Sequence, residues 1–539
     1  MAQVLLQVYH RLHELLLRHQ YHTTSSPQAA ALAASVVLVC PLVVLVLVRR
    51  LAATPSTTTA REQLLSRLPS PPRRLPVIGH LHLVGSLPHV SLRDLAAKHG
   101  RRGLMLLRLG AVPTLVVSSP SAAQAVLRTH DHVFASRPYS AIADIIFYGS
   151  SDIVFSPYGE YWRQLRKIAT THLLTNKKVR SYRHARQQET MLLVTKVREA
   201  AMAHTSVDLT ELLNEFSNDV FCHAVSGKIF KEEGRNRLLR ELGEINSALL
   251  GGFNVEDYFP VLAKLDIVKR ILCAKARDVN KRWDELLNKL IHVHESRPVS
   301  ERDGEESDFI DVLLSVQQEY NLTRDSIKAQ LVIMLEAGTD TSFIVLEYVV
   351  VELMRNPRVL AKLQSEVRTA IPKGKEIVTE DDLSGLTYLK AVIKETLRLH
   401  ASAPLLVPHL STADCDIDGY TIPSGTRVLI NIWALARDPN YWESPEEFMP
   451  ERFMEGGSAA HMDFKGNDFS YLPFGSGRRM CPGINFAMGM IEGMVTNLVY
   501  HFNWELAPEL AEKGIDMTES FGVTLHRNEK LLLVPVVPH

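Results

Sequence analysis

The ten residues Phe474-Gly-Ser-Gly-Arg-Arg-Met-Cys-Pro-Gly483 decide the fold of this chain. Their one cysteine, Cys481, stands among three glycines and two residues after Arg479. Glycine lets a backbone turn tightly and approach a flat ligand closely. An apolar run at helical spacing follows, and Pro482 suits its first position, so the thiol is expected at a helix N-terminus, where its pKa is lowered. A lone cysteine is usually an inert core residue, but the full pattern favours a thiolate that ligates a metal.

Composition excludes several classes of function. The chain has 539 residues with 60 Lys and Arg and 60 Asp and Glu, so its net charge is zero. Nucleic-acid binding needs a basic surface, so no nucleic-acid partner is expected. The cysteines are scattered without Cys-x-x-Cys pairs, which argues against a disulfide framework and a structural zinc site. They are Cys40, Cys222, Cys273, Cys415 and Cys481.

The N-terminal segment, residues 1–48, contains an uncharged apolar run at 29–48. Its length matches the thickness of a bilayer core, which predicts a transmembrane helix. The alternative is a cleaved signal peptide, but the run is longer than the usual apolar region of such a signal. Lys and Arg are more frequent after the run than before it, which predicts a cytosolic C-terminal side.

A linker and a proline-rich strap are predicted at 49–76. Residues 51–67 are rich in Ser and Thr, and four prolines lie between 69 and 76. Proline fixes φ and removes a backbone donor, so the strap is expected to be stiff and extended rather than helical. The main folded domain is then expected to span 77–539.

The remaining chain is predicted to be mainly α with small β-sheets. A hairpin is expected from strands at 104–109 and 114–118, and a second from 521–525 and 530–536. Residues 119–128 and most of 185–295 are expected to be helical, with a break at 251–260. Residues 139–157 are expected to form an irregular, substrate-facing loop.

Three motifs carry candidate site residues. Trp162 and Arg166 are four residues apart, which places them on one helical face. The helix predicted at 325–356 holds Ala337-Gly-Thr-Asp340-Thr341 in its middle, between apolar runs. A glycine in a helix interior costs about 1 kcal/mol, so this helix is expected to leave room for a ligand and bring a carboxylate and a hydroxyl to it.

Glu395 and Arg398 lie three apart on a helix predicted at 388–399, and Arg452 follows in Pro450-Glu-Arg-Phe453. A buried ion pair is unfavourable unless it is part of a network. These three residues are therefore expected to form a buried structural network rather than a catalytic one.

Taken in order, these features resemble those of the cytochrome P450 superfamily, specifically the plant microsomal type, and they cover nearly the whole chain. The resemblance implies the cytochrome P450 fold with an N-terminal transmembrane helix and a haem whose iron is ligated by Cys481. It implies that Asp340 and Thr341 deliver protons and that Trp162, Arg166, His409 and Arg479 bind the haem propionates. His409 has a second interpretation as an ordinary loop residue.

The resemblance also implies the reaction and its partners. A haem-thiolate monooxygenase takes O2 and a small apolar substrate, and receives electrons from NADPH through a separate cytochrome P450 reductase. The expected location is the endoplasmic reticulum membrane, with one transmembrane pass and a cytosolic catalytic domain. A basic face is expected either to dock the reductase or to be merely solvated; it comprises Arg163, Lys167, Lys177 and Lys178.

Several segments are similar to the grass enzymes of benzoxazinoid synthesis, which oxidise indole and its derivatives, and among these to the indole 2-monooxygenases. They include LLGGFNVEDYFP and DMTESFGVTLHRNEKLLLVP. Many relatives have His-Pro-Pro where this chain has His400-Ala-Ser-Ala-Pro404, which weakens the transfer of a substrate. Specificity is expected in 139–157, Ala337, 402–407 and 521–525. The alternatives are oxidation of a terpenoid, phenylpropanoid or oxime, an O2-independent isomerase or dehydratase, and a membrane haem-binding scaffold.

Overall fold

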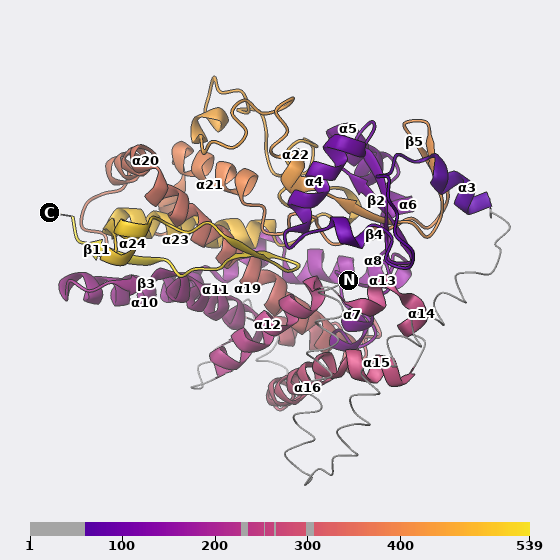
Figure 1. The fold of residues 1–539 in the computed structure, drawn as a ribbon. Helices are drawn as coiled ribbons and strands as arrows, with labels where there is room; N and C mark the ends of the chain where they lie inside the picture. Colours follow the sequence, from indigo (N-terminus) through magenta and orange to yellow (C-terminus); the bar gives the residue numbers. More distant parts are fainter. Residues whose placement is uncertain (1–59, 228–234, 253, 264–265, 298–306, 539) are drawn as a thin grey trace, which may run out of the picture.

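The computed structural model describes residues 60–227, 235–252, 254–263, 266–297 and 307–538. Helices form most of this part of the chain, and four small sheets lie beside them (Figure 1), so the predicted fold class is confirmed. The transmembrane helix predicted at 29–48 lies outside the described residues.

The N-terminal half of the described chain is a series of helices and short helical turns. They are α3 (Ala60–Arg67), η1 (Leu81–Leu83), α4 (Pro88–His99), α5 (Pro120–Gln124), η2 (Ala125–Thr129), α6 (Asp131–Phe134), α7 (Ala141–Ile146), α8 (Glu160–Ile168), η3 (Ala169–Leu173), α9 (Asn176–Ser181), α10 (Arg183–Met202), α11 (Leu209–Ser226), α12 (Arg235–Gly251), α13 (Val255–Tyr258) and α14 (Pro260–Ala263).

The C-terminal half continues in the same way around the longest helix. Its helices are α15 (Asp266–Leu272), α16 (Ala274–Glu295), α18 (Phe309–Ser315), α19 (Arg324–Arg355), α20 (Pro357–Ala370), η5 (Glu380–Leu383), α21 (Thr387–Leu399), α22 (Ile432–Leu435), η6 (Pro450–Phe453), η7 (Gly477–Arg479), α23 (Ile484–His501) and α24 (Pro508–Lys513).

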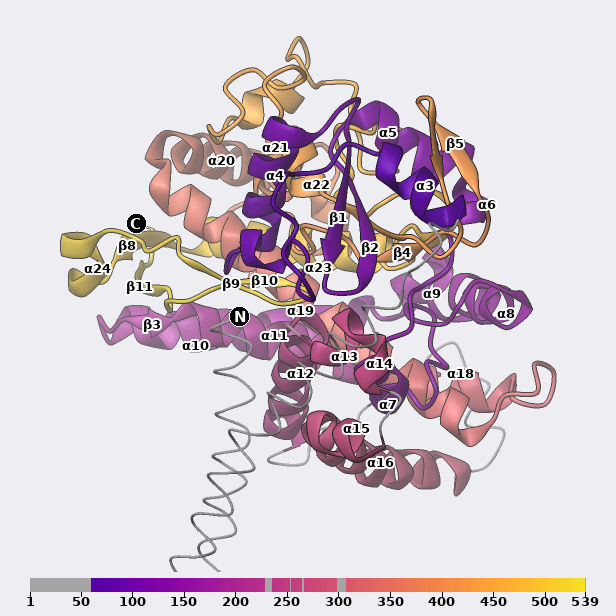
Figure 2. The same ribbon diagram turned by 45° about the vertical axis from the view of Figure 1, so that its right-hand side comes forward.

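Helix α19 is the central element, as Figures 1 and 2 show. The Thr323 hydroxyl accepts a hydrogen bond from Ser326 N (3.0 Å) and caps its start. Gly338 in its middle packs on Phe221 of α11, where an added Cβ would lie 2.1 Å from the ring. Among the described residues α19 alone is long and apolar enough to cross a membrane. Most of it is buried inside the protein, so it is a core helix.

The largest sheet has the strand order β1-β2-β7-β4. Strands β1 (Leu104–Leu109) and β2 (Val112–Val117) form the predicted antiparallel hairpin. Strand β7 (Arg427–Ile430) pairs with β2 in parallel, and β4 (His409–Leu410) pairs with β7. A separate small hairpin is formed by β5 (Cys415–Ile417) and β6 (Tyr420–Ile422).

The predicted terminal hairpin of 521–525 with 530–536 is wrong. Strand β9 (Glu519–Phe521) pairs with β10 (Leu525–Arg527), and residues 522–524 form the tight turn between them. Strand β11 (Leu532–Val536) pairs instead with β3 (Val207–Asp208) and β8 (Asn503–Leu506), which are distant in sequence.

Two predicted irregular segments contain helices. The linker predicted to reach residue 67 includes α3, whose sequence Ala-Arg-Glu-Gln-Leu-Leu-Ser-Arg is rich in helix formers. The loop predicted at 139–157 includes the short, buried α7. The proline strap at 69–76 does lack helix, as predicted, and Leu106 N of β1 donates a hydrogen bond to the carbonyl of Pro69 (2.7 Å).

The predicted network of Glu395, Arg398 and Arg452 is present and buried. Arg398 donates two hydrogen bonds to the Glu395 carboxylate (2.8 and 2.9 Å), and Arg452 donates a third (3.1 Å). The guanidinium groups also donate to backbone carbonyls, including those of Ala436 and Glu443. Because every charge has several partners, the network can tolerate its burial, and it ties α21 to the segment before the cysteine loop.

The Arg398→Met variant is expected to lose roughly 3 kcal/mol or more of unfolding free energy, because Glu395 keeps its buried charge with one arginine removed. The urea-unfolding midpoint measures this loss. The control is Lys281→Met, because Lys281 and Glu285 form an exposed pair at 3.9 Å, and removing it should change stability by less than about 1 kcal/mol. Equal effects of the two substitutions would contradict a stabilising network.

Candidate active site

One cavity brings together residues that are far apart in sequence. It has a volume of about 250 Å³, and we call it the Cys481 cavity. Cys481, Phe474 and Phe486 line it from the cysteine loop and α23, and Ala337 and Thr341 line it from α19. A ligand in this cavity therefore lies between the thiol and the middle of the central helix.

The cysteine loop needs its glycines. Gly475 and Gly477 have φ values of +69° and +67°, which residues with a Cβ rarely adopt. An added Cβ on Gly477 would lie 2.0 Å from the carbonyl oxygen of Leu127. The loop thus turns sharply and packs against η2 while Cys481 lies at the cavity.

Helix α23 begins at Ile484, not at Pro482 as predicted. Cys481 therefore precedes the helix, and the backbone N–H of Gly483 donates to its sulfur (3.4 Å). Burial raises the pKa of the Cys481 thiol, while the Gly483 N–H and the charge of Arg166 lower it. The net shift is upward, so the prediction of a lowered pKa is wrong for the free thiol.

Helix α8 places Trp162 and Arg166 on one face, as predicted, and both line the Cys481 cavity. The Trp162 indole N–H is already engaged, because it donates to the carbonyl of Ile153 (2.9 Å). Arg166 makes no side-chain hydrogen bond or ion pair with any residue that the structure describes. Burial lowers the pKa of Arg166 and the Cys481 sulfur raises it, with a net decrease. Arg166 is therefore the member of the pair with donors free for a ligand.

Arg479 and His409 also line the cavity. Arg479 stacks over the Trp162 ring at 4.3 Å and donates to backbone carbonyls, including those of Ala135 (2.7 Å) and Ser156 (2.6 Å). His409 Nδ1 lies 2.8 Å from the carbonyl of Phe134 and donates to it. Burial holds the pKa of His409 well below its usual range, so the imidazole is neutral and its Nε2 is an acceptor.

Sequence reasoning missed Arg137, which lines the same cavity and is 7% exposed. Its guanidinium donates to the carbonyls of Val154 (3.0 Å) and Val407 (2.7 Å). It thereby joins the two loops that flank the cavity. The one signal in the sequence was a lone arginine between apolar runs, in Phe134-Ala-Ser-Arg-Pro138.

The structure does not bring Asp340 into the Cys481 cavity. Asp340 lines a neighbouring cavity of about 190 Å³, which we call the side chamber. Thr524 donates a hydrogen bond to its carboxylate (2.6 Å), and His526 Nε2 lies 3.3 Å from it. Thr341 lines both cavities and donates to the Ala337 carbonyl (2.7 Å). Thr524 and His526 were not predicted, although Thr524 belongs to a segment predicted to face the substrate.

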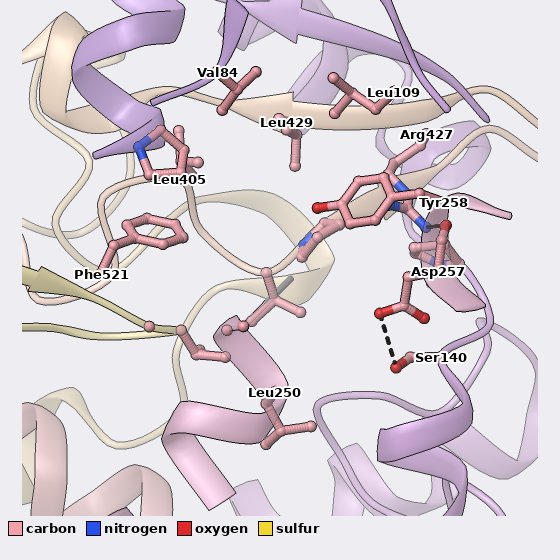
Figure 3. Close-up of a pocket in the computed structure, with 18 of the residues that line it drawn as sticks. Val84, Leu109, Ser140, Leu250, Asp257, Tyr258, Leu405, Arg427, Leu429 and Phe521 are labelled. Carbon is pink, nitrogen blue, oxygen red and sulfur yellow. Dashed lines mark hydrogen bonds between the residues drawn. The ribbon is translucent and has the colours of Figure 1, made fainter. Parts of the chain in front are cut away.

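A third, larger cavity of about 470 Å³ adjoins the other two and is shown in Figure 3. Leu405, Leu429 and Phe521 form an apolar wall, and Tyr258 lies opposite beside Arg427. Residues from three of the segments predicted to set specificity line this outer cavity. They lie in 139–157, 402–407 and 521–525.

The residues of the Cys481 cavity fit a haem. A cysteine thiolate would be a suitable ligand for haem iron, and the surrounding wall is largely apolar. Arg166 offers free donors for a carboxylate, which an arginine binds with two parallel hydrogen bonds. The Cys481 loop and α19 enclose the cavity from opposite sides.

Comparison with known proteins decides the family. The model of the family described as Cytochrome P450 matches residues 69–534. The chain is a cytochrome P450. It is 56% identical to the Zea mays indole-2-monooxygenase over 475 residues, which cover 88% of each chain. It is also 56% identical to the Zea mays indolin-2-one monooxygenase over 483 residues, which cover 88% of this chain and 90% of that protein.

The solved structure of a zebrafish cytochrome P450 with abiraterone superposes on this chain with a TM-score of 0.69 at 25% sequence identity. The superposition covers 84% of this chain and 100% of the zebrafish chain. The fold predicted from the cysteine loop is thus confirmed. The cofactor of this cytochrome P450 is haem, and the protein is a monooxygenase that uses O2 and a redox partner.

Asp340→Asn is expected to make stability less dependent on pH. Burial lowers the pKa of His526, but the contact with Asp340, together with the charges of Asp340, Glu347 and Glu244, raises it to above the usual value of 6.5. Such a histidine stabilises the fold below its unfolded pKa, and this contribution is lost as the pH rises through its folded pKa. The variant should lose less than about 1 kcal/mol of unfolding free energy near pH 6, and the loss should shrink toward pH 9.

Urea unfolding across this pH range measures the difference. The control is Asp94→Asn, which removes an exposed aspartate beside Arg93 and should show no such trend. A loss that is constant from pH 6 to pH 9 in Asp340→Asn would contradict the coupling to His526.

Proposed function

We propose that this cytochrome P450 hydroxylates a small aromatic nitrogen heterocycle, such as indole or an indolinone, in benzoxazinoid-type biosynthesis. The observation that carries the proposal is the 56% identity to three Zea mays enzymes whose names specify indole, indolin-2-one and 3-hydroxyindolin-2-one. The apolar Cys481 cavity and side chamber are consistent with such a substrate.

We propose that the Cys481 thiolate ligates the haem iron and that the cavity residues around it hold the cofactor. Arg166 binds a propionate with its free guanidinium, and Trp162, His409 and Arg479 form the adjoining wall. The bound haem supplies the oxygen-activating chemistry, which the protein positions and shields from water.

Thr341 and Asp340 are proposed to move protons. The Thr341 hydroxyl lies on the haem side of α19 and exchanges a proton with a ligand in the Cys481 cavity. Asp340 faces the other cavity, where its contact with the partly exposed His526 provides a connection toward solvent. The two residues therefore act in series along α19, with Asp340 as the outer group.

We propose that residues 1–48 form an N-terminal segment with a single membrane span at 29–48. Residues 49–76 then form a linker and strap, and residues 77–539 form a cytosolic catalytic domain at the endoplasmic reticulum membrane. Electrons come from NADPH through a separate cytochrome P450 reductase. The proposed docking face comprises Arg163, Lys167, Lys177 and Lys178. Arg163 pairs with Glu160, and Lys178 donates to Ser307, so both are also anchored within the protein.

A second candidate is oxidation of a different plant secondary metabolite, such as a terpenoid, phenylpropanoid or oxime. A Strychnos relative named norfluorocurarine oxidase is 43% identical over 473 residues. The Ala401-Ser-Ala sequence, which differs from the usual Pro-Pro, also leaves the substrate open. An isomerase or dehydratase that needs no O2 is disfavoured by the presence of the Asp340-Thr341 pair.

The test is a substrate-binding difference spectrum followed by turnover with a plant reductase and NADPH. Indole or an indolinone should shift the haem spin state and yield a product that carries one added oxygen atom. A terpenoid and a fatty acid of similar size serve as controls and should do neither. A response to the terpenoid alone would replace the proposed substrate with the second candidate.

A further inference from the structure

The side chamber combines apolar walls with a glutamate, Glu336, for which the described residues provide no ionic partner. Leu239, Leu250, Phe155 and Val523 supply apolar surface. Glu336 of α19 lines the chamber, one helical turn before Asp340. No arginine, lysine or histidine that the structure describes forms an ion pair with Glu336. A carboxyl group in this setting needs hydrogen-bond partners.

One oxygen of Glu336 is held and the other is free. Asn246 of α12 donates a hydrogen bond from Nδ2 to Glu336 Oε1. Asn246 is fully buried and is not among the residues that line the chamber, so it positions the carboxyl rather than contacting a ligand. Glu336 Oε2 has no hydrogen-bond partner among the described residues.

The carboxyl group is neutral in this environment. Burial raises the pKa of Glu336 well above its usual range, and the nearby charges of Asp340 and Asp152 raise it further. A protonated carboxyl offers a carbonyl acceptor and an O–H donor side by side. Two parallel hydrogen bonds can then form with a group that presents a donor and an acceptor in the same spacing.

We propose that Glu336, positioned by Asn246, is a substrate-binding residue that recognises the N–H and carbonyl edge of a planar bicyclic lactam. The substrate N–H donates to Glu336 Oε1, which has a second lone pair beside the one that Asn246 occupies, and the Oε2–H donates to the substrate carbonyl. The apolar chamber walls cover the ring faces. This inference rests on the proposed function and adds to it the group that orients the substrate.

The geometry directs the rest of the ring toward the haem site. Ala337 follows Glu336 and lines both the side chamber and the Cys481 cavity, as do Thr341 and Val407. Ala337 has a small side chain, so a flat ring can pass over α19 at this point. A lactam held at Glu336 therefore extends its carbocyclic or C3 edge into the Cys481 cavity, where oxidation takes place.

The test compares spectral dissociation constants of the haem-loaded protein for three ligands of similar shape: indolin-2-one, N-methylindolin-2-one and indane. The wild type should bind indolin-2-one about tenfold more tightly than the N-methyl compound, because a buried hydrogen bond is lost. Glu336→Leu should weaken indolin-2-one about tenfold or more and leave indane within about threefold. Glu336→Gln, whose amide also pairs a donor with an acceptor, should keep indolin-2-one within about threefold.

The control is Glu241→Leu, because Glu241 is an exposed glutamate of the same helix α12 that pairs with Arg282 and does not line the chamber, so its loss should not change indolin-2-one binding. Equal binding of indolin-2-one by Glu336→Leu and the wild type would overturn the proposal. Equal weakening of indolin-2-one and indane would also overturn it, because Glu336 would then only shape the cavity. If the wild-type protein binds no indole derivative, both the proposed function and this inference are overturned. If it binds indole but not indolin-2-one, only the inference is overturned.

Discussion

The whole site depends on one arrangement: Cys481 and the middle of α19 line the same cavity. The cysteine loop can turn only because Gly475 and Gly477 take left-handed conformations, and Gly477 sits against the Leu127 carbonyl where a Cβ would clash. On the opposite side, α19 is fixed by its contact between Gly338 and Phe221. The buried Glu395 network holds the segment that leads to the cysteine loop. The position of a cofactor between the two walls therefore follows from packing that is remote from the chemistry.

Helix α19 also divides the space that a substrate and its protons can use. Successive residues on a helix point about 100° apart, so Asp340 and Thr341 face different directions, and only Thr341 lines both cavities. Thr341 reaches the Cys481 cavity, whereas Asp340 faces the side chamber and contacts Thr524 of the β9–β10 turn. In the proposed mechanism, substrate orientation and proton supply therefore belong to the side of α19 that faces the side chamber, and oxygen chemistry to the side that faces the thiol.

The sequence predicted what is encoded locally. The cysteine loop, the bounds of α19 and the Glu395–Arg398 pair each follow from residue types at short, fixed spacings, and Arg452 was recognised from a second short motif, Pro450-Glu-Arg-Phe453. The partners of β11 and the contact of Asp340 with His526 could not be predicted, because each joins segments far apart in the chain. The raised thiol pKa was missed because burial, which the sequence does not show, outweighs the nearby N–H donor. Glu336 gave no signal in the sequence, since its proposed role depends on a hydrogen bond from Asn246 on another helix.

The most direct measurement is the absorption spectrum of the reduced, CO-bound protein in the wild type and in Cys481→Ser. A thiolate ligand should give a strongly red-shifted Soret band in the wild type, and the variant should lose it. Cys415→Ser is the matched control, since Cys415 lies in β5 away from the Cys481 cavity, and it should keep the band. A red-shifted band that persists in Cys481→Ser would contradict the assignment of Cys481 as the haem ligand and, with it, the account of the site.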